Sequence, residues 1–186
     1  PEGDIFSVAD PNEGWWIEIT PAGQWVAQRV PNDSFVVIAN NSRIGAIDPN
    51  DPSRFLVSAN LVEYARQKGW YDPAHGAFEY SRAYGEIGDE SLRREWRGNC
   101  LLGGRTLNQD ERLLAVVPAR KLRPQDIMVV LRDHYEGTEY DLTKGYEKGS
   151  PHHTSERGIC RMYTDASTVA QLRSWLPPEI GGVYWI

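Results

Sequence analysis

Apolar and polar residues alternate along the first 30 residues in short runs that turn-forming residues separate. In segment 14–20 the two faces of the chain carry Trp16, Glu18 and Thr20 on one side and Trp15, Ile17 and Ile19 on the other. This period of two residues predicts a half-buried strand. Segments 4–10 and 23–30 predict two further strands, because Asp-Pro-Asn-Glu-Gly and Thr-Pro-Ala-Gly turn signals separate the three. We therefore expect an antiparallel meander.

The run FVVIAN, residues 35–40, does not alternate. A continuous apolar run is typical of a strand that is covered on both faces, so this segment predicts the fourth and most buried strand of the meander. Two adjacent amides, Asn40 and Asn41, follow its apolar residues. Asparagine often begins a turn, and an amide held on a rigid element also suits a catalytic site. Both interpretations stay open at this point.

Loop and helix signals dominate the middle of the chain. Proline-rich segment 47–58 predicts a loop, and helical spacing with capping residues predicts helices at 58–70, 89–104 and 123–137. The remaining segments predict a short extended piece at 78–85, a long polar loop at 141–156, and strands at 157–164, 167–175 and 181–186. Strands, then helices, then strands predict the α+β class, with helices layered on a largely antiparallel sheet.

Composition and charge narrow the class of protein. The 186 residues fit one domain with a sizeable core. The net charge of -6 weighs against nucleic acid as a partner, because phosphate binding requires clustered Lys and Arg. We interpret the nearest basic cluster, SLRREWRG at 91–98, as a solvated helix face. No window holds the roughly 20 apolar residues of a membrane-spanning helix, so no membrane partner is expected.

Both ends of the chain predict a longer protein. The sequence begins at Pro1 and stops within the apolar run GGVYWI. We therefore expect residues 1–186 to be the central fragment of a single domain whose upstream and downstream parts lie outside the chain. Since the true N-terminus would then be absent, the compartment stays unassigned, with the cytoplasm as a working assumption.

Six strings spread along the chain resemble one family: GWWIEI, QWVAQRVPND, IANNSRIGAID, GWYDP, LRDHYEGTEYDLT and LPPEIGGVYW. They are similar to the N-terminal-nucleophile cysteine dipeptidases, the PepD-like group of bacterial peptidases. The resemblance extends from Asp4 to Trp185. It implies an αββα sandwich, of which this chain is the central portion, and a small peptide as substrate. It also implies the rest of the parent chain as a partner and no cofactor, and it leaves a homo-oligomer open.

The resemblance also implies a mechanism. A cysteine at the N-terminus of the processed enzyme attacks the peptide carbonyl, its own α-amine manages the proton, and water hydrolyses the thioester. Position 1 of this chain is proline, so the nucleophile is expected upstream, and the chain alone is expected to be inactive. Cys100 and Cys160 are interpreted as structural, because neither can become an N-terminal nucleophile without cleavage. Two cysteines make no disulfide framework, so reduced thiols are expected, with one disulfide as the alternative.

Asn40 is the candidate for stabilising the oxyanion. Related acylases of the superfamily place an asparagine just after a core strand at this position, and Asn40 matches it at the end of FVVIAN. An amide donates a hydrogen bond without carrying a charge, as an oxyanion donor should. Asn41 is a second candidate, for substrate binding. A plain turn stays the alternative for both residues.

Three arginines are further candidates. Arg157 and Arg161 flank GIC in a predicted strand, where a spacing of four places both on one face. The resemblance implies an arginine near the nucleophile on a comparable strand. The alternative is that both arginines form a row on the protein surface. The sequence does not decide which of the two faces the site. Arg43 follows Asn40 by three residues and is suited to grip a dipeptide carboxylate. Its alternative is a salt bridge to Asp48 or Asp51.

No metal site is predicted. The segment HYEGTEYD has neither the paired histidines of a zinc helix nor the pattern of a calcium loop. His152 and His153 lie in the polar loop, where adjacent histidines are usually exposed, so they receive no role.

Two alternative functions remain open. An amidase or acylase that cleaves another C–N bond would use the same groups. A non-catalytic module could instead bind a partner on an aromatic platform built from Trp15, Trp16, Trp25 and Trp185. Three or more exposed, coplanar tryptophans would favour that module, whereas buried tryptophans would favour the hydrolase.

Overall fold

The computed structural model describes residues 3–20, 22–85, 89–111, 113–144, 151–152 and 156–186. Its strands are β1 (Asp4–Ala9), β2 (Gly14–Ile19), β3 (Trp25–Arg29), β4 (Phe55–Val57), β5 (Val169–Leu172) and β6 (Gly182–Trp185). Its helices are α1 (Leu61–Gln67), the 3-10 helix η1 (Pro73–His75), α2 (Tyr80–Tyr84), α3 (Asp89–Gly103), α4 (Pro124–Leu131) and α5 (Pro178–Gly181). Antiparallel sheets combined with helices confirm the α+β class.

The N-terminal meander forms as predicted through its first three strands. The sheet is antiparallel in the order β1-β2-β3-β4. Ile17 of β2 pairs with Ala27 of β3, and the buried face of β2 is the one that carries Trp16, which is 2% exposed, and Glu18. The main core lies beside this sheet and against α1 and α2, and consists of Trp16, Val26, Ile44, Leu61, Ala65, Phe78 and Tyr80.

The prediction that residues 35–40 form the fourth strand is wrong. Phe35 makes one isolated bridge to Val116, and the following residues pair with no strand among those described. The apolar side chains are instead covered by packing: Val36 and Ile38 contact the core. The fourth strand is β4, from a segment expected to be a loop. A continuous apolar run indicates burial, but it does not specify strand pairing.

Three other predicted segments differ from the structure. Residues 80–84, expected to be extended, form α2. Helix α4 ends at Leu131 and not at 137, and the backbone of Tyr135 has a φ of +65°, which a helix cannot accommodate. Residues 157–164 form turns and irregular backbone, so no strand is present there. The predicted loop at 141–156 lies partly outside the described residues.

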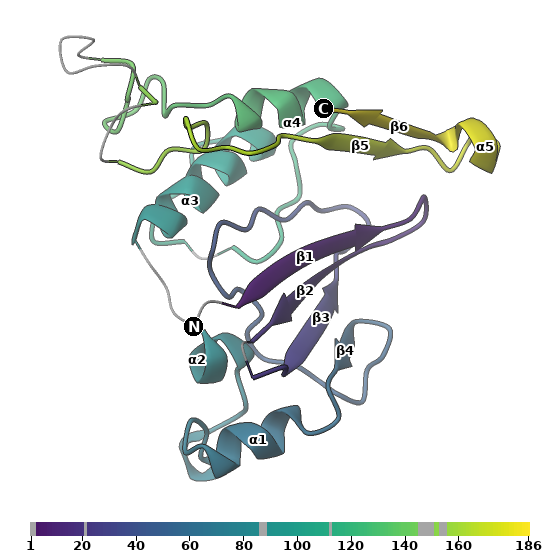
Figure 1. Ribbon diagram of the computed structural model, residues 1–186, viewed down its shortest axis with the longest axis vertical. Helices are drawn as coiled ribbons and strands as arrows, with labels where there is room; N and C mark the ends of the chain where they lie inside the picture. Colours follow the sequence, from purple (N-terminus) through teal and green to yellow (C-terminus); the bar gives the residue numbers. More distant parts are fainter. Residues whose placement is uncertain (1–2, 21, 86–88, 112, 145–150, 153–155) are drawn as a thin grey trace.

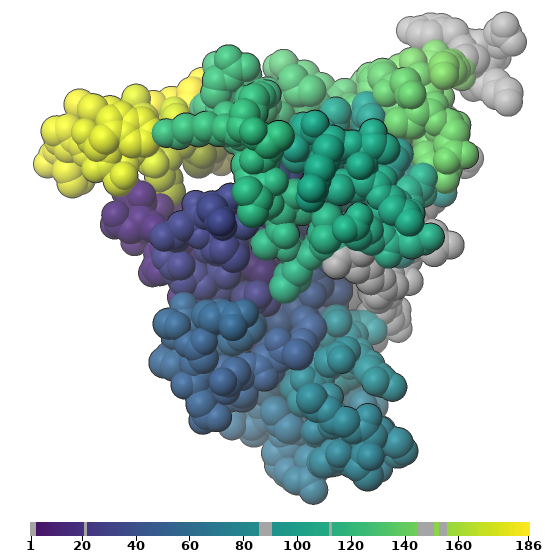
Figure 2. Space-filling model, turned by 180° about the vertical axis from the view of Figure 1, so that it is seen from behind, coloured from purple at the N-terminus to yellow at the C-terminus, as the bar shows by residue number. Residues whose placement is uncertain are grey.

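Figure 1 shows α3, α4 and the β5–β6 hairpin grouped above the four-stranded sheet, with α1 below it. The hairpin and α5 project to one side, which is also visible from behind in Figure 2. β5 and β6 are antiparallel, with Ala170 opposite Tyr184. Among the described helices, none has the length and apolar content needed to cross a bilayer.

A close contact between α3 and residues 35–40 provides a test of this packing. A Cβ added at Gly98 would lie 2.8 Å from Val37 Cγ1. Gly98→Ala should lower the free energy of unfolding by about 1–2 kcal/mol, because overpacking against a stiff β-branched side chain outweighs the gain in helix propensity. Urea unfolding of the intact protein measures the change.

Gly103→Ala is the matched control, because a Cβ there meets Val116 at an ordinary 3.6 Å. It should leave stability within about 0.5 kcal/mol of the parent. Adding Val37→Ala to Gly98→Ala should recover part of the loss. Equal stabilities for the two alanine variants would contradict the packing described here.

Candidate functional site

A buried carboxylate of the sheet fixes residues 39–44, which we call the Asn40 segment. Glu18 lies on the inner face of β2 and is 2% exposed. Its Oε1 accepts hydrogen bonds from the backbone N–H groups of Arg43 at 2.8 Å and Ile44 at 3.1 Å. Its Oε2 accepts one from Ser42 Oγ at 2.5 Å. These three hydrogen bonds to one buried carboxylate hold the segment to the sheet.

Helix α3 supplies a second buried carboxylate to the Asn40 segment. Glu95 is 3% exposed; it accepts a hydrogen bond from the Ala39 N–H at 3.1 Å and lies 3.3 Å from Arg43 Nε. Burial raises the pKa of Glu95, and the Arg43 guanidinium, the Ala39 N–H and a hydrogen bond from the Asn41 side chain partly offset the rise. The segment is therefore fixed between β2 and α3.

Asn40 lies at an exposed bend of this segment. Its φ of +56° is in the left-handed region, which asparagine tolerates better than most residues. Its Oδ1 accepts a hydrogen bond from Arg94 Nη1 at 3.0 Å. Since a guanidinium only donates, the amide oxygen must face Arg94, and the Nδ2 hydrogens point elsewhere. A bend, and not the end of a buried strand, presents this amide.

Arg43 and Asn41 are turned into the protein. The Arg43 side chain is 7% exposed, pairs with Glu95, and donates from Nη2 to the Leu113 carbonyl at 2.9 Å. The predicted alternative, an ion pair, is therefore present, but the partner is Glu95 and not Asp48 or Asp51. Asn41 is 1% exposed. In this structure both residues anchor the Asn40 segment.

The charged residues of α3 connect two loops, so the interpretation of 91–98 as a solvated face is wrong. Arg93 forms an ion pair with Glu156, and Arg97 forms a bidentate pair with Asp133, from Nε to Oδ1 at 2.9 Å and from Nη2 to Oδ2 at 2.6 Å. The Arg93 and Arg97 side chains are only 21% and 13% exposed. The acidic partners come from distant parts of the sequence, which a local pattern does not indicate.

Arg157 and Arg161 do not lie on a strand, so the predicted shared strand face is absent. Both are half-buried. The Arg157 carbonyl accepts a hydrogen bond from the Tyr135 hydroxyl at 3.2 Å, and the Arg161 carbonyl accepts one from the Thr164 N–H at 3.3 Å. Their surroundings are thus the turns after α4, while Asn40, Asn41 and Arg43 gather between β2 and α3.

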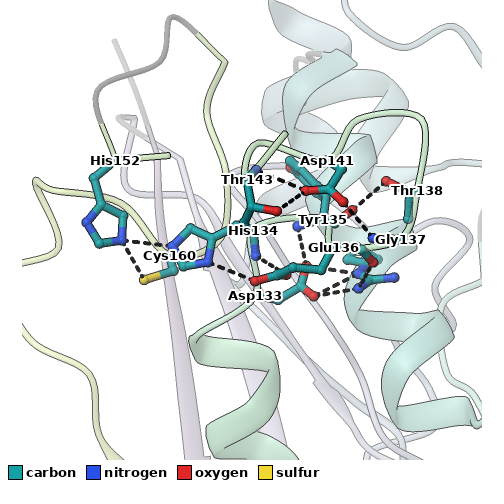
Figure 3. Close-up of polar contacts among 11 residues, drawn as sticks. Asp133, His134, Tyr135, Glu136, Gly137, Thr138, Asp141, Thr143, His152 and Cys160 are labelled. Atoms are coloured by element: carbon teal, nitrogen blue, oxygen red, sulfur yellow. Dashed lines mark hydrogen bonds and ion pairs between the residues drawn. The ribbon is translucent and has the colours of Figure 1, made fainter. Parts of the chain in front are cut away.

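A second cluster of reactive side chains lies in those turns. His134 Nε2 is 2.8 Å from His152 Nε2, which is 3.6 Å from Cys160 Sγ. Figure 3 shows the two rings and the sulfur turned toward one another. Sequence reasoning missed this cluster because 18 and 8 residues separate its members along the chain. No short motif has that spacing.

The two cysteines differ in their surroundings. They are free thiols, as expected. Cys100, in α3, accepts a hydrogen bond from the Leu107 N–H at 3.3 Å. Burial and the nearby Glu136 carboxylate raise the pKa of the Cys160 thiol. Cys160 is therefore protonated at neutral pH and is not activated as a nucleophile.

The surface offers little support for an aromatic binding platform. Trp16 is buried, and Trp15, Trp25 and Trp185 are half-buried. An open pocket of about 430 Å³ lies between residues 32–35 and 118–122, and none of the predicted site residues line it. A cavity of about 10 Å³ beside Arg43 and Glu95 has room for a single water molecule.

Comparisons with known proteins agree with the resemblance noted from the strings. The model of peptidase family C69 matches residues 1–186. A probable dipeptidase of Salmonella dublin is 32% identical over 194 residues, covering 99% of this chain and 44% of that protein. A probable dipeptidase of Latilactobacillus sakei is 30% identical over 193 residues, covering 100% of this chain and 40% of that protein. The chain thus spans about two fifths of the length of these curated relatives.

Proposed function

Because the chain belongs to peptidase family C69, we propose that it forms part of a dipeptidase, which hydrolyses the peptide bond of small peptides. The family match over all 186 residues carries this proposal. The relatives named probable dipeptidase support the substrate class.

The nucleophile in this proposal is an N-terminal cysteine outside the chain. Its thiol attacks the peptide carbonyl, its α-amine takes the thiol proton and returns it to the leaving amine, and water then hydrolyses the thioester. The domain would be an αββα sandwich, to which this chain contributes the sheet and helices described above. Arg157 and Arg161 remain candidates for an arginine near the thiol.

Asn40 is the proposed donor to the oxyanion that forms during attack. Two observations support this role: Asn40 is exposed, and Arg94 engages its amide oxygen, so that the Nδ2 hydrogens point away from Arg94. The adjacent guanidinium polarises the amide and strengthens it as a donor. Glu18 and Glu95 fix the backbone on either side of Asn40, so the donor needs little reorganisation when charge develops.

Hydrolysis assays on the intact protein, in which the rest of the proposed parent chain is present, test the substrate class. Unblocked dipeptides should release free amino acids, measured by mass spectrometry, while N-acyl amino acids and longer peptides should react more slowly. Alkylation of the N-terminal cysteine should abolish release. Turnover of N-acyl amino acids without turnover of dipeptides would contradict the proposal and favour the amidase alternative.

A further inference from the structure

His134, His152 and Cys160 bring three metal-ligating atoms together, and we propose that they bind zinc. Their ligand atoms lie within 4.8 Å of one another. Two nitrogens on a tetrahedral zinc ion are about 3.3 Å apart, and a nitrogen and a thiolate sulfur are about 3.6 Å apart. The observed separations are 2.8 Å between the two Nε2 atoms and 3.6 Å from His152 Nε2 to Cys160 Sγ. A small widening between the rings admits the ion.

A carboxylate orients the first of these ligands. Glu136 Oε1 lies 3.1 Å from His134 Nδ1, and Glu136 Oε2 accepts the His134 backbone N–H at 2.7 Å. The Nδ1 atom carries the ring proton of His134 in this arrangement, so its Nε2 lone pair is directed at His152 and Cys160 (Figure 3). Histidine ligands of zinc commonly donate their second N–H to a carboxylate in this way.

The backbone around the cluster is fixed before any ion binds. The Cys160 N–H donates to the Asp133 carbonyl at 3.1 Å, which places the thiol beside His134. The Asp133 side chain is held by Arg97 of α3 and accepts the Tyr135 N–H at 2.8 Å. Tyr135, fully buried, keeps a φ of +65°, a strained conformation for an aromatic residue that the surrounding contacts maintain.

The ligand types and charges favour zinc over other ions. Two imidazoles and one thiolate are nitrogen and sulfur donors, which zinc prefers and calcium or magnesium do not. Zinc binding would release the proton of the Cys160 thiol to solvent, and the resulting thiolate and the Glu136 carboxylate would together balance the charge of a divalent cation. The residues that the structure describes supply three protein ligands, which leaves the fourth position of a tetrahedron to water on the exposed side of His152.

Cobalt(II) titration tests the proposal directly. Intact protein without a polyhistidine tag is freed of metal with a chelator and titrated with Co²⁺. We expect a thiolate-to-cobalt charge-transfer band in the near ultraviolet, which added Zn²⁺ removes. Cys160→Ser should abolish this band. His152→Ala, at an exposed position that tolerates substitution, should weaken zinc binding at least tenfold, and Glu136→Gln should weaken it about 10-fold.

Cys100→Ser and His75→Ala are matched controls, because Cys100 lies in α3 and His75 is exposed in η1. Both should retain the cobalt spectrum and the zinc affinity of the parent. Parent protein without the charge-transfer band would overturn the proposal, as would a band that persists in Cys160→Ser. These measurements do not involve peptide hydrolysis, so their outcome is independent of the proposed dipeptidase activity.

Discussion

Asn40→Asp should lower kcat/KM for dipeptide hydrolysis by the intact protein about a hundredfold, the usual effect of removing one oxyanion donor. Aspartate has almost the same shape as asparagine, tolerates the left-handed backbone at this position, and can still accept the hydrogen bond from Arg94. It lacks the N–H that the oxyanion requires, and its negative charge opposes the developing one. Steady-state kinetics with the best dipeptide substrate measure the loss.

Asn40→Gly separates the amide from the backbone conformation. Glycine adopts positive φ readily, so the bend is retained while the side chain is removed. This variant should also lose most of its activity, and both variants should melt within a few degrees of the parent. If Asn40→Asp keeps full turnover, the residue only anchors Arg94, and the oxyanion role is lost.

Glu18→Ala should destabilise the intact protein by about 3–5 kcal/mol, because it leaves several buried donors without an acceptor. These donors are the Ser42 hydroxyl, the Arg43 and Ile44 backbone N–H groups and the Trp16 indole N–H, which lies 3.3 Å from Oε1. Alanine supplies no replacement, and the site is too enclosed for each donor to reach solvent. Denaturant unfolding followed by tryptophan fluorescence gives the change in unfolding free energy.

Glu63→Ala provides the comparison for a carboxylate at the surface. Glu63 lies in α1, pairs with Arg66 at 3.3 Å, and is 56% exposed. Its loss should change stability by less than about 0.5 kcal/mol. The stability loss of Glu18→Gln, which keeps one acceptor oxygen, should fall between the losses of Glu18→Ala and Glu63→Ala. Similar losses for Glu18→Ala and Glu63→Ala would show that Glu18 does not hold the Asn40 segment.

The sequence predicted the strands of the meander well because their period of two is a local property. It also placed Trp16 and Glu18 on one face, and a charged residue on an inner face is a signal of a buried partner. It failed at residues 35–40, since an apolar run can be covered by a helix such as α3 as well as by neighbouring strands. Strand β4 has only three residues, too few for a recognisable period.

The candidate sites could be predicted only in part. Asn40 is a candidate through the family resemblance, and Asn41 and Arg43 are candidates because they lie beside it on the chain, but which of the three is exposed depends on Glu18 and Glu95. The pairing of each carboxylate with this segment joins residues 24 to 56 positions apart. The proposed zinc ligands could not be predicted for the same reason, because they are separated along the chain and only folding brings them together.

The exposed outer edge of β1 affects how the protein behaves in solution. Among the described strands it pairs only with β2, and all six of its residues are exposed. Its outer edge carries amide and carbonyl groups that pair with no strand among the described residues, beside the exposed Phe6 and Val8, which makes it a template for strand addition. A preparation of residues 1–186 alone would therefore be prone to self-association through this edge, and charged substitutions on β1 are the first remedy to try.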